Sequence, residues 1–243
     1  MTEEIKIGKT PVFVVRPEGD IKGGLIVIHE VWGLTDHIKD VAKRYSDEGY
    51  LVYAPDLLSD TGIEEKVTDQ LQQDLFNPEK RNEVQPKLRE LMAPIQAPDF
   101  ATNTVESLKE VFEVLVKEPK TNAKVAVLGF CFGGTYSYNL AIAEPKLVAA
   151  VPFYGHCDQD ANELRKISCP LLAFFGENDE ALVSKLPDLQ NRMHEAEVDY
   201  TSQVYANCGH AFFNDSNPYA YNKEAANDAW VRSLDFLKTA FSS

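Results

Sequence analysis

The chain has 243 residues, of which 44% are hydrophobic and 26% charged, as in an ordinary globular protein. Its formal net charge of −14 argues against a nucleic acid as a partner, because binding to phosphate backbones depends on clustered Lys and Arg side chains. Residues 1–10 are charged and lack the apolar region of a secretory signal, and no apolar run reaches membrane-spanning length, so we expect a cytoplasmic protein without a membrane partner.

Short apolar runs alternate with helical stretches along the whole chain. A helix is predicted over residues 36–48 and another at the end of the chain, and the runs predicted as strands are 11–16, 24–28, 50–54, 124–128, 147–153, 171–175 and 200–205. Strands that are apolar without interruption have no solvated face, so the pattern predicts an α/β fold, with a mostly parallel sheet and helices on both faces. A chain of this length fits one domain over residues 1–243.

A polar stretch over residues 57–99 interrupts this pattern. It is partly helical, is longer than a usual connection between elements, and contains Pro78, Pro86, Pro94 and Pro98. We predict that this stretch forms an excursion over the carboxyl edge of the sheet.

The sequence GFCFGG at residues 129–134 follows the predicted strand 124–128 and precedes a run compatible with a helix. It matches the nucleophile elbow, a strained turn that needs small residues two positions before and after the nucleophile, here Gly129 and Gly133 around Cys131. The partial positive charge at a helix N-terminus favours the nucleophilic thiolate. The alternative is that Cys131 is a buried structural thiol. The spacing of the glycines does not match the G-x-G-x-x-G pattern, so a dinucleotide-binding site is disfavoured.

Two later loops carry the residues expected to assist the nucleophile. In this type of fold the order along the chain is nucleophile, acid and histidine, each at the carboxyl end of a strand. Asp179 follows the predicted strand 171–175 and is the expected acid, with Glu177 as the alternative. His210 follows the strand 200–205 and is the expected base.

The remaining chemistry-bearing residues give weaker signals. His37 and His194 fall in charged, helical surroundings and are predicted to be solvated, and His156 follows a core strand and is expected to have a structural role or to line the pocket. The segment beginning His29-Glu30 lacks the second histidine of the zinc-binding H-E-x-x-H pattern, because position 33 is Gly33. We therefore expect no metal.

Five motifs occur along the chain: HEVWG at 29–33, APDL at 54–57, GFCFGG at 129–134, GENDE at 176–180 and CGHAFF at 208–213. In this order they resemble the dienelactone hydrolase family of carboxymethylenebutenolidase-like proteins, and the resemblance spans nearly the whole chain. It implies an α/β-hydrolase fold and hydrolysis of small lactones or activated carboxylic esters, without a cofactor. It also implies that Cys131 forms an acyl-enzyme, that His210 moves the proton and that Asp179 orients His210.

The same resemblance implies roles for the residues around the triad. The backbone N–H groups of Phe132 and Val31 would hold the oxyanion, and Glu30 would be a resting partner that keeps the thiol protonated until substrate displaces the carboxylate. The alternative for Glu30 is an exposed loop acid. Three aromatic residues are predicted either to wall the pocket or to belong to the core: Trp32, Tyr154 and Phe212.

One position departs from the family pattern. Well-characterised members of the family carry an arginine four residues after the catalytic histidine, where it helps to grip a substrate carboxylate, and this chain has Asn214 there. A basic residue of the excursion could replace it, and the candidates are Arg81, Lys87 and Arg89.

Two classes of function are therefore considered. The first is a hydrolase that acts on a small-molecule ester or lactone as a monomer or a homodimer. The second is a non-catalytic or redox-sensing protein of the same fold, in which Cys131 is a reactive thiol.

Overall fold

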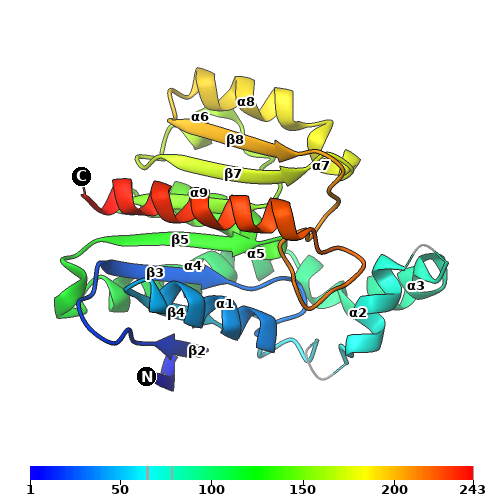
Figure 1. Ribbon diagram of the computed structural model, residues 1–243, viewed down its shortest axis with the longest axis horizontal. Helices are drawn as coiled ribbons and strands as arrows, with labels where there is room; N and C mark the ends of the chain where they lie inside the picture. Colours follow the sequence, from blue (N-terminus) through cyan, green and yellow to red (C-terminus); the bar gives the residue numbers. More distant parts are fainter. Residues whose placement is uncertain (64–65, 78, 243) are drawn as a thin grey trace.

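The computed structural model describes residues 1–63, 66–77 and 79–242. Its centre is an eight-stranded sheet with the order β1-β2-β4-β3-β5-β6-β7-β8 (Figure 1). The strands are β1 (Thr2–Ile7), β2 (Thr10–Val15), β3 (Gly23–Ile28), β4 (Tyr50–Pro55), β5 (Val125–Phe130), β6 (Ala149–Phe153), β7 (Leu171–Gly176) and β8 (Tyr200–Tyr205). All strand pairs from β4 to β8 are parallel, whereas β2 pairs antiparallel with both β1 and β4. The predicted α/β fold is confirmed.

The first strand, β1, was not indicated by the sequence pattern. Its residues, Thr2–Ile7, are mostly exposed and charged, and only Ile7 is buried. It forms the edge of the sheet beside β2. Charged side chains are common on edge strands because they oppose pairing with another molecule, and they also remove the apolar alternation that identifies a strand.

Helices cover both faces of the sheet, with α1 and α9 on one face and α4 and α5 on the other (Figure 1). The helices are α1 (Asp36–Asp47), α2 (Asp69–Phe76), α3 (Arg81–Leu91), α4 (Phe100–Leu115), α5 (Phe132–Ala143), α6 (Ala161–Leu164), α7 (Glu180–Val183), α8 (Leu186–Glu195) and α9 (Lys223–Ser242), with 3-10 turns at Ala93–Gln96 and Pro119–Thr121.

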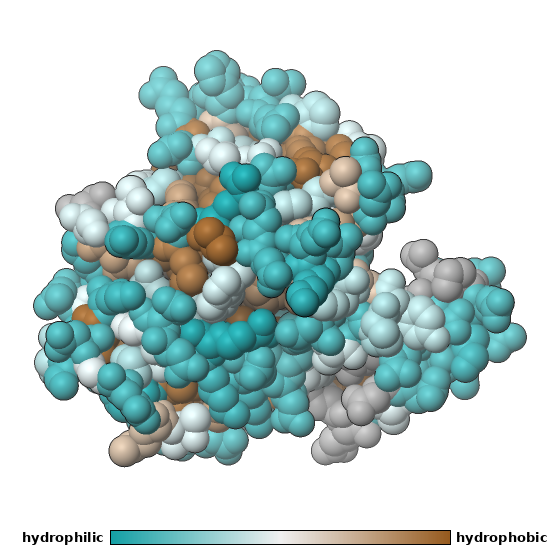
Figure 2. Space-filling view, in the orientation of Figure 1, coloured by the Kyte–Doolittle hydropathy of each residue, from teal (hydrophilic) through white to brown (hydrophobic). Residues whose placement is uncertain are grey.

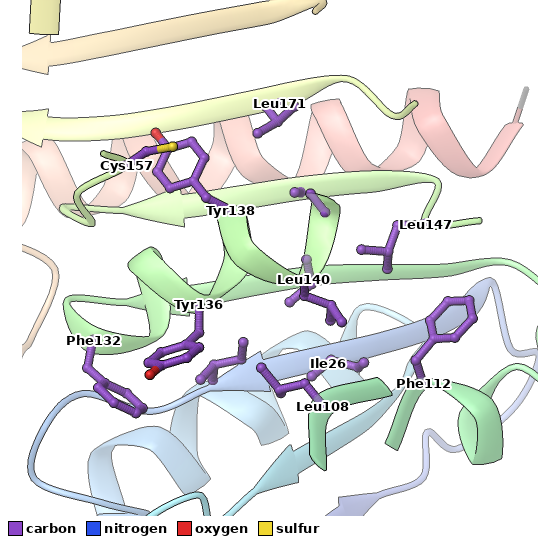
Figure 3. Packing of buried hydrophobic residues seen from close by; sticks show 14 of the residues in the cluster. Ile26, Leu108, Phe112, Phe132, Tyr136, Tyr138, Leu140, Leu147, Cys157 and Leu171 are labelled. Atoms are coloured by element: carbon purple, nitrogen blue, oxygen red, sulfur yellow. The ribbon is translucent and has the colours of Figure 1, made fainter. Parts of the chain in front are cut away.

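Two hydrophobic clusters correspond to these two faces. One joins the sheet to α4 and α5 through residues such as Leu108 and Leu140 (Figure 3). The same cluster includes Met193 of α8. The other joins it to α1 and α9 through residues such as Ile38 and Leu237. Because both faces are covered, β3, β4 and β5 are buried at every position, as their unbroken apolar sequences require.

The excursion between β4 and α4 carries α2 and α3, which project beyond the carboxyl ends of the strands (Figure 1). Figure 2 shows this projection as a largely hydrophilic lobe beside the main body. Residues of the excursion and of the loops after β7 and β8 line a common depression at this end of the sheet. Within the described ranges, no helix has the length and apolar character needed to cross a membrane.

Candidate active site

Cys131 forms the turn between β5 and α5, at the carboxyl edge of the sheet. β5 ends at Phe130 and α5 begins at Phe132, so Cys131 alone reverses the backbone direction. Its φ of 57° and ψ of −111° are rarely adopted by L residues and cost about 1–3 kcal/mol. Its N–H donates to the carbonyl of Phe153 at 3.0 Å, which ties the turn to β6. The Cys131 side chain stays partly exposed, whereas the other three cysteines are buried.

Backbone segments approach one another at this turn so closely that only glycine fits. A β-carbon on Gly129 would overlap the carbonyl of Gly133, and one on Gly133 would overlap the carbonyl of Ile28 on β3. The N–H of Gly133 donates to the carbonyl of His29 at 3.1 Å. The glycine spacing of the motif is therefore required by contacts among β5, α5 and the loop after β3.

Asp179 and His210 meet because β7 and β8 are adjacent parallel strands whose following loops leave the same edge. Nδ1 of His210 lies 2.5 Å from Oδ2 of Asp179. A carboxylate only accepts hydrogen bonds, so Nδ1 carries the donated proton and Nε2 is left for a second partner. Glu177, the alternative acid, instead accepts a hydrogen bond at 3.0 Å from the N–H of Asn207.

The second partner of His210 is the thiol of Cys131. Burial lowers the pKa of His210, but the charge and hydrogen bond of Cys131 and the hydrogen bond to Asp179 outweigh it, and the net pKa is well above its usual value. The ring of Tyr154 packs against that of His210 with centroids 5.0 Å apart. The structure therefore brings a thiol, an imidazole and a carboxylate into one chain of contacts.

The two N–H groups predicted to hold an oxyanion lie on segments that the turn joins. Phe132 is the first residue of α5, so its N–H has no acceptor within the helix. Val31 lies in the loop after β3, next to the carbonyl of His29 that anchors Gly133. His29 also accepts a hydrogen bond from the N–H of Leu57 at 3.0 Å, which fixes the start of the excursion, a role not indicated by the sequence.

Glu30 is buried and is not an exposed loop acid. Only 2% of its surface is accessible, and its Oε2 accepts a hydrogen bond at 2.8 Å from Nδ2 of Asn214. Burial raises the pKa of Glu30, while the charges of His37 and His210 and the hydrogen bond from Asn214 act in the opposite direction. Asn214 is itself buried, and its side-chain amide is engaged in the hydrogen bond to Glu30.

A depression of about 1300 Å³ opens beside His210 and Asp179. Leu88, Arg89 and Met92 line it from the excursion, opposite the loops after β7 and β8. Lys87 is exposed, and the side chain of Arg81 lies outside the described residues. The three aromatic residues predicted as pocket wall or core are buried and belong to the core clusters: Trp32, Tyr154 and Phe212.

The prediction that His37 is solvated is wrong. Its side chain is 2% exposed, and its Nδ1 lies 3.0 Å from Oδ1 of Asp215. The charged neighbours in its helix suggested a surface position, but the residue lies on the face of α1 that packs on Phe130. His194 is exposed, as predicted. His156 is also exposed, and its Nδ1 lies 3.0 Å from the hydroxyl of Thr135.

Cys131 differs from the other three cysteines in how far its side chain is buried. Burial raises the pKa of Cys157 to about 11 and that of Cys169 to about 12. Cys208 lies two residues before His210 and is almost completely inaccessible. In the part of the chain that the structure describes, no group of three or more His, Cys, Asp or Glu residues could hold a metal ion.

A sequence profile of the dienelactone hydrolase family matches residues 10–241. This chain belongs to the dienelactone hydrolase family. Among its relatives, a protein of Saccharolobus solfataricus named as a carboxymethylenebutenolidase is 32% identical over 245 residues, covering 95% of this chain and 94% of the relative. The protein called usf of Aquifex pyrophilus is 31% identical over 225 residues, covering 88% of this chain and 87% of that protein.

Solved structures support the same fold. The crystal structure of a protein from Klebsiella pneumoniae described as a dienelactone hydrolase superposes with a TM-score of 0.82. It covers 100% of this chain and 98% of the other, at 23% sequence identity. At that identity the likeness establishes the α/β-hydrolase fold alone.

The contacts at the turn predict the effect of adding one methyl group. We expect Gly129→Ala to lower the free energy of unfolding by about 3 kcal/mol or more, because backbone atoms of Gly133 have no room to move. Urea denaturation measures this change. Gly209→Ala is the matched control, since no atom lies within 4 Å of the added carbon, and it should change stability by less than about 0.5 kcal/mol. Equal effects of the two variants would contradict the close contact.

The raised pKa of Glu30 predicts a pH-dependent effect of Glu30→Gln. Below the pKa of an unfolded glutamate both proteins carry a neutral group, so their stabilities should agree. As pH rises from there to the higher folded pKa, the wild type loses stability because its unfolded state ionises first, and the variant does not. We expect Glu30→Gln to gain about 1.4 kcal/mol for each unit of the pKa increase. Urea denaturation from pH 4.5 to 8 tests this, and a pH-independent difference would contradict it.

Proposed function

We propose that this protein hydrolyses small lactones or activated carboxylic esters with Cys131 as nucleophile. The observation that carries this proposal is the chain of contacts from Cys131 to His210 and from His210 to Asp179. The strained turn leaves the thiol partly exposed beside His210, and His210 and its orienting acid Asp179 line the depression. The family of the chain is consistent with this chemistry.

The reaction would proceed in two halves through an acyl-enzyme. Nε2 of His210 takes the thiol proton as Cys131 Sγ attacks the carbonyl carbon, and the N–H groups of Phe132 and Val31 stabilise the negative charge that develops on the carbonyl oxygen. When the C–O bond breaks, the leaving alkoxide takes this proton from Nε2. Nε2 then takes a proton from water as the resulting hydroxide attacks the thioester, and it returns that proton to Sγ when the C–S bond breaks and the carboxylic acid is released. Asp179 keeps Nδ1 protonated and stabilises the imidazolium in both halves.

Glu30 is proposed to be the resting partner of the thiol. A carboxylate near a thiol opposes formation of the thiolate and so limits oxidation of the unoccupied enzyme. Its proximity is supported by Tyr154, whose pKa is raised well above its usual value by burial and then by the charges of Glu30 and Cys131. Both groups therefore lie close to one phenol.

Arg89 is proposed to hold an anionic group of the substrate. Asn214 occupies the position at which other family members carry an arginine, and its side chain is engaged with Glu30. Among the described lining residues of the depression, Arg89 is the one arginine or lysine. A guanidinium presents two parallel N–H donors to a carboxylate, so a substrate with a carboxylate remote from the ester would be preferred.

The nucleophile is tested by Cys131→Ala. Removal of a triad member should reduce turnover by about 10³-fold or more and abolish the acyl-enzyme. The measurement is hydrolysis of cis-dienelactone, trans-dienelactone and p-nitrophenyl acetate, with intact-protein mass spectrometry for the adduct. Cys169→Ala removes a buried thiol and should retain both turnover and adduct. Turnover by Cys131→Ala would overturn the proposal, and peroxide modification of Cys131 without any turnover would favour a redox-sensing protein.

The anionic anchor is tested by Arg89→Gln. For an ester with a remote carboxylate we expect KM to rise roughly tenfold, because a hydrogen bond to a charged group contributes about 1.5 kcal/mol or more. KM for an uncharged ester of similar size should stay the same. Lys87→Gln removes a neighbouring positive charge outside the depression and is the matched control. An equal rise of KM for both esters would contradict a specific anchor.

A further inference from the structure

His29 directly follows β3, its side chain is fully buried, and both of its ring nitrogens make hydrogen bonds. Nδ1 lies 2.6 Å from the carbonyl oxygen of Glu30. Nε2 lies 3.0 Å from the backbone nitrogen of Leu57, at the start of the excursion. A carbonyl oxygen only accepts and a backbone N–H only donates, so the ring carries its proton on Nδ1 and accepts at Nε2. The two hydrogen bonds hold the ring in one orientation.

The bond from Nδ1 fixes the peptide unit that joins Glu30 to Val31. The carbonyl of Glu30 accepts from Nδ1 of His29 and also from the N–H of Gly33 at 3.2 Å. A peptide unit is planar, and in its trans form the C=O and N–H bonds point in opposite directions. The bonds that hold the Glu30 oxygen therefore also hold the Val31 N–H, which points away from the imidazole. In the part of the chain that the structure describes, no residue accepts a hydrogen bond from this N–H.

The same residue contacts the segment that carries the second proposed oxyanion donor. The rings of His29 and Phe132 are stacked, with centroids 5.6 Å apart and planes within 1° of parallel. The backbone carbonyl of His29 accepts from the N–H of Gly133 at 3.1 Å, one residue beyond Phe132. His29 thus packs against the start of α5 through its ring and its backbone, and it joins the segments that carry the Phe132 and Val31 N–H groups.

The Glu30–Val31 peptide needs such a support because it lies outside the helices and strands of the fold. A hydrogen-bond donor stabilises an oxyanion best when it already points to the place where the charge develops, so that no reorganisation is needed during the reaction. The bond from the buried imidazole is shorter than the bond from Gly33 and comes from a ring that is itself held at both nitrogens. His29 is therefore the side chain that sets the direction of this peptide.

We propose that His29 is a positioning residue, which orients the Val31 N–H toward the oxyanion through the hydrogen bond from its Nδ1 to the Glu30 carbonyl. This inference rests on the proposed function, because it requires an oxyanion to form at Cys131. His29 acts through a peptide group and does not touch the substrate, and its proton stays on Nδ1 throughout. Its effect therefore belongs to steps that build negative charge on a carbonyl oxygen, and not to every reaction of the thiol.

Two substitutions separate the hydrogen bond from the packing of the ring. His29→Phe keeps a planar ring that can stack on Phe132 but has no donor. His29→Asn loses the stacked ring, while its amide nitrogen can occupy the place of Nδ1 and donate to Glu30. Loss of a whole oxyanion donor costs about 10²- to 10³-fold in kcat, so a donor that is present but no longer oriented should cost about tenfold or more. With p-nitrophenyl acetate we expect this fall for His29→Phe with KM nearly unchanged, and kcat within about threefold of wild type for His29→Asn.

Two reactions of the same thiol distinguish an oriented donor from general support of the turn. Acylation of Cys131 by p-nitrophenyl acetate forms a C–S bond, expels p-nitrophenolate and places negative charge on the carbonyl oxygen on the way. Alkylation by iodoacetamide forms a C–S bond at a methylene carbon, expels iodide and builds no such charge. Intact-protein mass spectrometry measures both rates. We expect His29→Phe to slow acylation about tenfold and to leave alkylation within about twofold. His194→Phe, at an exposed histidine, is the matched control and should change neither rate.

The outcomes separate this inference from the proposed function. If the wild type forms no acyl adduct on Cys131, the proposed function fails and the inference fails with it. If the wild type forms the adduct and His29→Phe forms it equally fast, or loses acylation and alkylation together, only the inference is overturned. His29→Asn as slow in acylation as His29→Phe also overturns it. If His29→Phe does not fold, His29→Gln replaces it, because its amide oxygen can accept from Leu57 while the Nδ1 donor is lost; acylation by His29→Gln at the wild-type rate overturns the inference.

Discussion

The arrangement at the carboxyl edge depends on one backbone contact, between the carbonyl of Ile28 and the α-carbon of Gly133. This contact brings α5 against the end of β3, and Gly129 lets β5 approach the same point. The strained conformation of Cys131 is maintained because buried strands on both sides leave the turn no alternative path. One contact thus sets the positions of the thiol, the Phe132 N–H and the loop with Val31 and Glu30.

Because the groups around this turn are largely buried, the proton affinity of each depends on the charges of the others. A thiol, a phenol, a carboxyl and two imidazoles lie where solvent screens little, and each alters the proton affinity of its neighbours. The protein as a whole carries a formal charge of −14, so a buried carboxylate receives no help from the surrounding field. Local partners, such as the amide of Asn214, must therefore stabilise the ionised form of Glu30.

Features that depend on residues close together in the sequence could be predicted from it. Features that depend on residues far apart along the chain could not. The turn at Cys131 could be predicted because its glycines lie within two residues, and Asp179 and His210 because strand order places them at one edge. Asp215 could not be assigned to His37, 178 positions away, and the charges near His37 suggested the wrong environment. The charged edge strand Thr2–Ile7 was missed because it buries almost nothing. Burial of Glu30 likewise follows from tertiary packing, not from its motif.

The two Asp–His pairs of this site make different use of the same hydrogen bond. In each, a carboxylate accepts a hydrogen bond from Nδ1 of the ring and so orients Nε2. One third of the His210 side chain is exposed toward the depression, so its Nε2 can exchange a proton with substrate and water. His37 is buried, and its Nε2 has no hydrogen-bond partner among the described residues. Exposure of the ring, rather than its partner, therefore separates the histidine proposed to move protons in turnover from the histidine that packs in the core.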